Sequence, residues 1–517
     1  MKRWLGLLAW NQKPRHVWAS WPYSSWRLMV RCEPKNGSFW LWWGPPLIFL
    51  SSPHWIQVRV ERYSSSLPMS KPPSKPSANR LKKSLGQGGR GRRRSAASQA
   101  VGQDKAPPRQ LPEHPRIPSA PAEVLTTIAE VEAFCCEARS EGEVAYDTEF
   151  IGEESYIPKI CLVQLATPQR VVLIDPLQGA PLDPVWSLLA DPAVRVLVHS
   201  GLQDLVPIWR ATGAPATNVL DTQVAAGFAD RSFPIALSAL VDEFVGITLD
   251  KSYTFTRWDQ RPLRPGHLEY AADDVRFLFV IADALAEITA ERGHDAKVEE
   301  ECRSLVDPKT YIPDPMHRMQ RAVGNRKFNR RQRTALLELL TLRDHIAQVE
   351  DLPPRSVLKD DVCARVAKDM PRAKDALLAI KHFPRPVVET WGDAILELLN
   401  TVREQDTEAL VAGSPRQESN QDRSRIDALL AFSSLLCWRE GIDSGIGASR
   451  SDISRFYLEA KEGQRPVGVL DAGWRAELLG APLFAMLQGE ASLTFRWSGG
   501  PEGAEASKKN PKAKRKR

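Results

Sequence analysis

The segment Val144-Ala-Tyr-Asp147-Thr148-Glu149-Phe150 constrains the fold and chemistry of this chain more than any other. Its β-branched and aromatic residues predict a strand. Asp147 and Glu149 are two residues apart, so both carboxylates point to the same face of that strand. Adjacent carboxylates repel each other, and three arrangements accommodate them: a divalent metal ion, a pair that shares a proton, or a solvated edge strand. The segment alone leaves all three open.

The residues around this segment predict an α/β domain. We expect strands over 144–150, 160–166, 171–174 and 195–199, with helices over 126–140 and 185–190 and from 202 onward. Three strands in succession indicate a meander, and the alternation of strand and helix that follows indicates parallel pairing. The sequence therefore predicts a mixed sheet with helices packed on it.

The second half of the chain is predicted to be all-α. Apolar residues recur at helical spacing, and helices are expected over 329–349, 360–368, 373–380, 386–402 and 425–441. Residues 413–422 are polar and are expected to form a linker.

The two ends of the chain lack these patterns. Residues 1–68 hold nine of the sixteen tryptophans and show no sustained period. We expect an over-extended gene model, with translation beginning at Met69, or a disordered extension; a tryptophan-rich membrane-surface anchor is the alternative. Residues 69–118 predict a disordered basic linker rich in Pro, Ser and Gly, and residues 499–517 predict a basic disordered tail.

Charge and cysteine content narrow the class of protein. The net charge is +7, and basic runs at 90–94 and 512–517 suit either solvated tails or a polyanion partner. The seven cysteines form no CxxC pair, which argues against a zinc site or a disulfide framework and favours a reducing, cytoplasmic location. No run of eighteen apolar residues exists, and no cleavage site follows the apolar start, so neither a membrane span nor export is expected.

Further acidic residues occur at positions where α/β proteins bind ligands. Asp204 follows a buried strand in the first turn of a helix, where a ligand site and a favourable helix dipole are equally good explanations. Asp221 is expected to be an N-cap. Tyr270 and Asp274 are one helical turn apart on one face, and a solvated surface pair is their alternative.

In chain order, Asp147-x-Glu149, Asp204 and Tyr270-x3-Asp274 resemble the three motifs of the DEDDy 3′→5′ exonuclease superfamily. The intervening segments are similar to ribonuclease D: 156–164, 221–226, 250–252, Trp258 and 261–263. The resemblance implies a ribonuclease H-like exonuclease domain over 119–300. Residues 325–405 resemble a helicase-and-RNase-D C-terminal (HRDC) domain, and residues 423–490 resemble a second, more diverged copy.

The resemblance implies a metal-dependent 3′→5′ exoribonuclease that releases nucleoside 5′-monophosphates. Asp147, Glu149, Asp204 and Asp274 would hold two Mg²⁺ or Mn²⁺ ions, and oxygen ligands suit such hard cations. Tyr270 would orient the attacking water. The implied substrate is precursor tRNA with a single-stranded 3′ tail, acted on by a monomer. A DNA 3′→5′ exonuclease and a non-catalytic nucleic-acid binder on the same fold are the rival functions.

The RNA contacts that we expect involve seven residues: Glu149, Phe150, Gln164, His199, Lys251, Trp258 and Arg261. Glu149 would contact the terminal nucleotide. His199 ends a strand, and a hydrogen-bonded structural role is its alternative. Trp258 suits the core as well as base stacking, and Lys251 and Arg261 suit solvent as well as phosphate.

Overall fold

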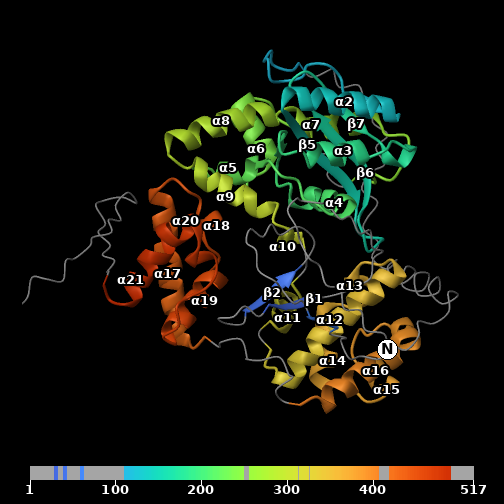
Figure 1. Ribbon diagram of the computed structural model, residues 1–517, viewed down its shortest axis with the longest axis vertical. Coiled ribbons are helices and arrows are strands. Elements are labelled where there is room, and N and C mark those ends of the chain that lie inside the picture. The colour runs from blue at the N-terminus through green and yellow to red at the C-terminus, as the bar shows by residue number, and fades with distance from the viewer. Residues whose placement is uncertain are drawn as a thin grey trace, which may run out of the picture. The chain divides into compact units, whose positions relative to one another are not determined.

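The computed structural model (Figure 1) describes residues 28–32, 39–43, 59–62, 110–249, 256–311, 314–324, 326–406 and 418–490. Two compact units cover Met1–Pro72 and Pro73–Arg517. In the first unit, β1 (Leu28–Cys32) pairs antiparallel with β2 (Phe39–Trp43) and β3 (Arg59–Arg62). These strands form in a range for which the sequence predicts no regular structure. Most of the linker expected over 69–118 and the whole tail expected over 499–517 lie outside the described residues.

The second unit contains a six-stranded mixed sheet in the order β4-β7-β6-β5-β8-β9. Its strands are β4 (Glu123–Leu125), β5 (Glu143–Ile151), β6 (Lys159–Ala166), β7 (Val171–Ile174), β8 (Arg195–Val198) and β9 (Val219–Asp221). The β5-β6-β7 meander is antiparallel, whereas β8 pairs parallel with both β5 and β9. The predicted mixed α/β sheet is confirmed.

Helices cover both faces of this sheet (Figure 1). Three of them, α2 (Ile128–Glu141), α3 (Asp183–Leu189) and α4 (Leu202–Thr212), share a core with Val144 and Tyr146. The other face, which includes Ala145, packs on α7 (Pro265–Arg276) and α8 (Leu278–Glu291). Because side chains alternate along a strand, Asp147 and Glu149 point to the α7 face.

The next helices form a domain with its own core. They are α11 (Pro315–Val323), α12 (Arg330–Glu350), α13 (Pro354–Val357), α14 (Asp360–Asp369), α15 (Lys374–Leu378) and α16 (Arg385–Glu404). The Asn329 side chain caps α12 by accepting a hydrogen bond from the Gln332 backbone N–H at 2.8 Å. Leu336, Leu340 and Val362 lie in the shared core. The helix predicted over 329–349 therefore forms.

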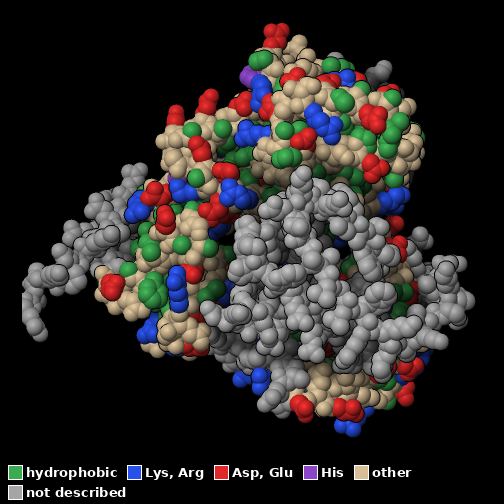
Figure 2. Space-filling model, in the orientation of Figure 1, with side chains coloured by type: hydrophobic (Ala, Val, Ile, Leu, Met, Phe, Trp, Pro, Cys, Tyr) green, Lys and Arg blue, Asp and Glu red, His purple; other side chains and the backbone are tan. Residues whose placement is uncertain are grey.

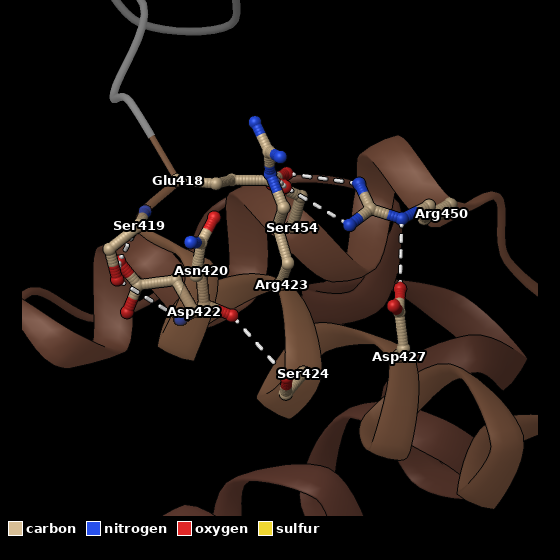
Figure 3. A network of polar contacts seen from close by, with 9 residues as sticks. All are labelled: Glu418, Ser419, Asn420, Asp422, Arg423, Ser424, Asp427, Arg450 and Ser454. Atoms are coloured by element: carbon tan, nitrogen blue, oxygen red, sulfur yellow. Dashed lines mark hydrogen bonds and ion pairs between the residues drawn. The ribbon is translucent and has the colours of Figure 1, made fainter.

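The last helices begin earlier than the sequence predicts. They are α17 (Asn420–Arg439), α18 (Ser444–Gly447), α19 (Arg450–Lys461), α20 (Gly473–Arg475) and α21 (Ala481–Leu487). The linker predicted over 413–422 is wrong at its end, because Ser419 and Asp422 form a capping box that starts α17. Figure 3 shows Arg450 of α19 donating to Glu418 and, at 3.0 Å, to Asp427, which ties α17 to α19.

This C-terminal region shares a core with helices of the exonuclease region: α5 (Thr222–Phe228), α6 (Leu237–Val245), α8 and α9 (Asp295–Leu305). The rings of Phe228 and Trp474 pack edge to face with centroids 5.2 Å apart. The indole N–H of Trp474 also donates to Glu301 at 2.8 Å. Residues 418–490 are therefore integrated with the sheet-bearing part and do not have a core of their own.

None of the helices in the described part of the chain has both the length and the apolar character needed to cross a membrane. The six cysteines whose side chains are described are all free.

Candidate active site

The site is built on the end of β5 that extends beyond its parallel neighbour. β8 pairs with β5 only from Glu143 to Ala145, so Asp147 and Glu149 lie past the end of β8. α4 begins there, a few residues after β8 ends. The carboxyl ends of strands are where α/β proteins place ligands, and the two acids of β5 lie in such a position.

Residues on either side of Asp147 hold Asp204 of α4 in place. The Thr148 hydroxyl donates to the Asp204 carboxylate, and the buried Tyr146 hydroxyl donates to the Asp204 backbone carbonyl at 2.8 Å. Asp204 itself is 7% exposed. Alternate residues of β5 therefore have different roles. Asp147 and Glu149 point toward α7, whereas Tyr146 and Thr148 hold Asp204 in place.

The turn before α4 is also held by an acid. Asp221 accepts from the backbone N–H groups of Ser200 at 2.9 Å and Gly201 at 3.0 Å. It also accepts from Gln223, as predicted for an N-cap of α5. A Cβ at Gly201 would lie 2.6 Å from the Val198 side chain, so only glycine allows the backbone at position 201 to lie this close to Val198. The N-cap prediction is confirmed, but the link to the turn before Asp204 was not foreseen.

α7 supplies Tyr270 and Asp274 on one face. The neighbouring acid, Asp273, is buried and lies 3.6 Å from the guanidinium of Arg276. Arg276 in turn donates to the Ala120 carbonyl at 3.1 Å. Asp273 is therefore tied into the protein interior, whereas Asp274 faces the other acids of the site.

Asp204 and Asp274 lie close enough to Asp147 and Glu149 to raise the pKa of both. Burial, followed by repulsion from Asp204, Asp274 and Glu149, raises the pKa of Asp147 well above its usual range. The pKa of Glu149 rises to about 8 through burial and the charges of Asp274 and Asp204. Burial is also the largest cause for Asp274, whose pKa rises to about 8, and for Asp204, whose pKa rises to about 6.

The chemistry of this donor set fits a divalent cation. Among the described residues, no Lys, Arg or His side chain forms an ion pair with Asp147, Glu149, Asp204 or Asp274. One of these carboxylates is buried and three are half-buried, and desolvated carboxylates without a basic partner are costly unless a cation compensates them. Within the same residues, no group of three or more His, Cys, Asp or Glu side chains is arranged to hold a metal ion.

Two of the expected RNA contacts lie inside the protein. Trp258 is 4% exposed, shares a core with Leu162, and packs on Tyr270 with ring centroids 6.1 Å apart. Both ring nitrogens of His199 are used, one with the Thr222 hydroxyl at 2.9 Å and one with the Ile235 carbonyl at 3.0 Å. These positions favour the structural alternatives for both residues. Lys251 lies outside the described residues.

Arg261 is likewise engaged within the protein. Its guanidinium donates to both carboxylate oxygens of Asp175, at 2.5 and 2.7 Å, and to the Cys161 carbonyl at 2.7 Å. Burial alone would raise the pKa of Asp175, but hydrogen bonds from Arg261 and Gln178 outweigh it and lower that pKa. This bidentate pair fixes the loop after β7 and leaves Arg261 little freedom to meet phosphate.

Arg261→Ala is expected to lower the free energy of unfolding by about 2 kcal/mol, because Asp175 would remain buried without its main cation. Chemical denaturation measures this loss. Arg257→Ala is the matched control, since Arg257 is exposed and pairs with its neighbour Asp259. Equal stability in the two variants would show that the buried pair does not stabilise the fold.

Two further residues lie beside the acids. Gln164 is directly opposite Asp147 across β5 and β6, is 0% exposed, and has no hydrogen-bond partner for either side-chain polar atom. Phe150 lines a hollow of about 340 Å³ together with Gln203, Val206 and Pro207 of α4. The site therefore combines buried and half-buried acids, an unpaired amide and, nearby, an apolar hollow.

The comparisons with known proteins agree with this architecture. A family described as 3′-5′ exonuclease matches residues 122–290, and the HRDC domain family matches residues 332–399. A ribonuclease D of Nitrobacter hamburgensis is 30% identical over 375 residues, which is 72% of this chain and 97% of that protein. A ribonuclease D of Gluconacetobacter diazotrophicus is 32% identical over 377 residues, 72% of this chain and 94% of its own length.

The crystal structure of Escherichia coli RNase D, described as an exoribonuclease involved in structured RNA processing, is 26% identical and superposes with a TM-score of 0.65. The match covers 72% of this chain and 99% of the E. coli protein. The mixed sheet, its helices and the domain that follows thus define a 3′→5′ exonuclease with an HRDC domain. Within that class, the chain belongs to the ribonuclease D family, and it is a 3′→5′ exoribonuclease. Exonucleases of this fold generally use divalent metal ions.

Proposed function

We propose that this exoribonuclease works through two divalent cations, Mg²⁺ or Mn²⁺, held by Asp147, Glu149, Asp204 and Asp274. The observation that carries the proposal is that four acids from three separate elements, β5, α4 and α7, come together, with Asp204 and Asp274 close enough to raise the pKa of both Asp147 and Glu149. When bound, such cations lower the pKa of the attacking water and compensate the negative charge that develops on the phosphate oxygens. The products are nucleoside 5′-monophosphates.

The protein's own residues orient the reactants. Tyr270, supported from behind by Trp258, orients the attacking water through its hydroxyl. In this role Tyr270 is a hydrogen-bonding group and not the main base. Glu149 contacts the terminal nucleotide as well as the cations. Thr148 and Tyr146 keep Asp204 positioned, so that substrate binding does not displace it.

The hollow beside Phe150 is suited to the base of a 3′-terminal nucleotide. It is lined mainly by apolar side chains, and it lies between the residue after Glu149 and the residues around Asp204. Packing of a base against the Phe150 ring tolerates any base. The preferred substrate is then a single-stranded 3′ end.

We infer that the RNA is structured and that precursor tRNA with a 3′ tail is the main substrate, processed by a monomer. The E. coli relative, which acts in structured RNA processing, supports the first part. The HRDC helices would contact the RNA body through its phosphates, as a chain of net charge +7 permits.

The test uses matched RNA and DNA hairpins with identical 3′ tails, labelled at the 5′ end. The purified chain is assayed after EDTA treatment and again after addition of Mg²⁺ or Mn²⁺. We expect stepwise shortening of RNA, release of nucleoside 5′-monophosphates and complete dependence on the added ion. Equal or faster shortening of the DNA would favour a DNA exonuclease, and binding without shortening would favour a non-catalytic protein.

Gln164→Leu is expected to change stability and activity in opposite directions. Removing a buried amide that lacks partners should raise the free energy of unfolding by about 1 kcal/mol. If the amide donates to Asp147 or to the bound substrate, kcat should fall about 10-fold to 100-fold with little change in KM. Thermal unfolding and steady-state kinetics measure both. Unchanged kcat would assign Gln164 no part in the reaction.

A further inference from the structure

Four arginines line a hollow in the HRDC domain. The hollow has a volume of about 300 Å³ and is formed by Arg318, Arg321, Arg343, Arg355, Asp360 and two prolines, residues 353 and 354. On the face shown in Figure 2, acidic and basic side chains of the described residues are interspersed. A hollow with four arginines and one carboxylate therefore differs from that mixed surface. We call these seven positions the arginine notch.

The positive charges of the notch arginines are only partly neutralised by carboxylates. Asp360 pairs with both Arg343, at 2.6 Å, and Arg355, at 3.2 Å, so one carboxylate serves two guanidinium groups. Arg321 is exposed and has no ion-pair partner among the described residues. Arg343 is 5% exposed, and its Nε has no hydrogen-bond partner. The notch therefore holds both excess positive charge and an unused buried donor.

The notch lies beside the contact between the HRDC domain and the active-site strand. Arg318 donates to Asp344 of α12 at 3.1 Å, and the other oxygen of Asp344 accepts from the Tyr156 hydroxyl at 3.0 Å. Tyr156 belongs to the loop between β5 and β6, seven residues after Glu149. An extended chain of that length spans at most about 25 Å, which limits how far this contact lies from the acids.

We propose that the arginine notch binds a backbone phosphate of the RNA body while the 3′ end occupies the carboxylate site. Guanidinium groups match phosphate oxygens in planar, bidentate geometry, which makes arginine suited to this contact. A stacked strand rises about 3.4 Å per nucleotide, so a strand of several nucleotides is long enough to reach from the acids to the Tyr156 contact beside the notch. The inference rests on the proposed function, because it assigns one of the contacts by which an RNA substrate is held.

The test compares Arg321→Glu/Arg355→Glu with Arg372→Glu/Arg385→Glu in the full chain. Both pairs make the same change in charge, and Arg372 and Arg385 are exposed residues of the same domain outside the notch. Binding of a tailed RNA hairpin is measured in EDTA at several salt concentrations. We expect the notch pair to weaken binding about 10-fold and to reduce the log–log salt slope by about 1 to 2, with a smaller effect from the control pair.

Hydrolysis of a labelled dinucleotide is measured in parallel with Mg²⁺. A dinucleotide occupies the carboxylate site alone, so its hydrolysis should be the same in wild type and both variants. Arg321→Ala/Arg355→Ala gives a milder change that retains the fold if the glutamate pair unfolds, and it should weaken hairpin binding in the same direction. A wild type that fails to cleave the dinucleotide contradicts the proposed function, whereas the binding comparison still tests the notch.

Three results would overturn the notch assignment. One is equal weakening of RNA binding by the notch and control pairs. Another is an unchanged salt slope in both notch variants. The third concerns the released nucleoside 5′-monophosphate, which also carries a phosphate. If the notch variants bind this labelled product more weakly but bind the hairpin as the wild type does, the notch is a product site and does not bind the RNA body.

Discussion

Asp147→Asn is expected to reduce the rate of RNA shortening by about 1000-fold or more while making the metal-free protein more stable. Charge stabilisation by bound cations is worth several kcal/mol, and about 4 kcal/mol corresponds to three orders of magnitude in rate. Asp147 interacts with all three of the other acids, so its replacement weakens the whole donor set. Rates are measured on a tailed RNA hairpin with saturating Mg²⁺.

The gain in stability has the same origin as the loss in activity. Asp147 is half-buried, and its pKa is raised by desolvation and by the charges of Asp204, Asp274 and Glu149, so its charge is unfavourable when no cation is present. An asparagine of nearly the same shape removes that charge. Glu154→Gln is the matched control, because Glu154 is exposed on the following loop and pairs only distantly with Arg257. A similar rate loss in the control variant, or full activity in Asp147→Asn, would refute the assignment of Asp147.

Local periodicity was enough to place most of the acids. The two-residue spacing of Asp147 and Glu149 puts them on one face of a strand, and the four-residue spacing of Tyr270 and Asp274 puts them on one face of a helix. Strand β5 was predictable from its β-branched and aromatic residues, and strands β6 to β8 from their mainly apolar runs. What is local in the chain could therefore be predicted from the sequence.

What the sequence did not reveal depends on contacts between distant segments. The bond from Thr148 to Asp204 joins residues 56 positions apart, and nothing in either segment marks the partner. Arg261 has a side chain that suits a surface, and its bidentate pair with Asp175, 86 positions away, follows from the packing of the loop before α7 on the sheet. The short strand β4 has only three residues, two of them exposed, and carries too little pattern to be recognised.

The metal-free protein is expected to lose stability as pH rises from about 5 to about 8.5. The pKa values of Glu149 and Asp274 are about 8 in the folded state, and that of Asp204 is about 6. Unfolded carboxyl groups titrate near 4, so over this window the folded state holds protons that the unfolded state has released. The free energy of unfolding therefore falls as pH rises, by about 3 kcal/mol, and Tm by about 10 °C.

Divalent cations are expected to oppose this loss of stability at high pH. A cation competes with protons for the same oxygens, so it binds more tightly as the carboxyl groups ionise and stabilises the folded state in proportion to occupancy. The Tm difference between protein in Mg²⁺ and protein in EDTA should thus be small at pH 5.5 and large at pH 8.5. Differential scanning calorimetry of wild type and Asp274→Asn isolates the contribution of the site, because the variant lacks one of the titrating groups. If the metal-induced shift were the same at both pH values, or if the variant reproduced the wild-type pH dependence, these carboxylates could not be where the ions bind.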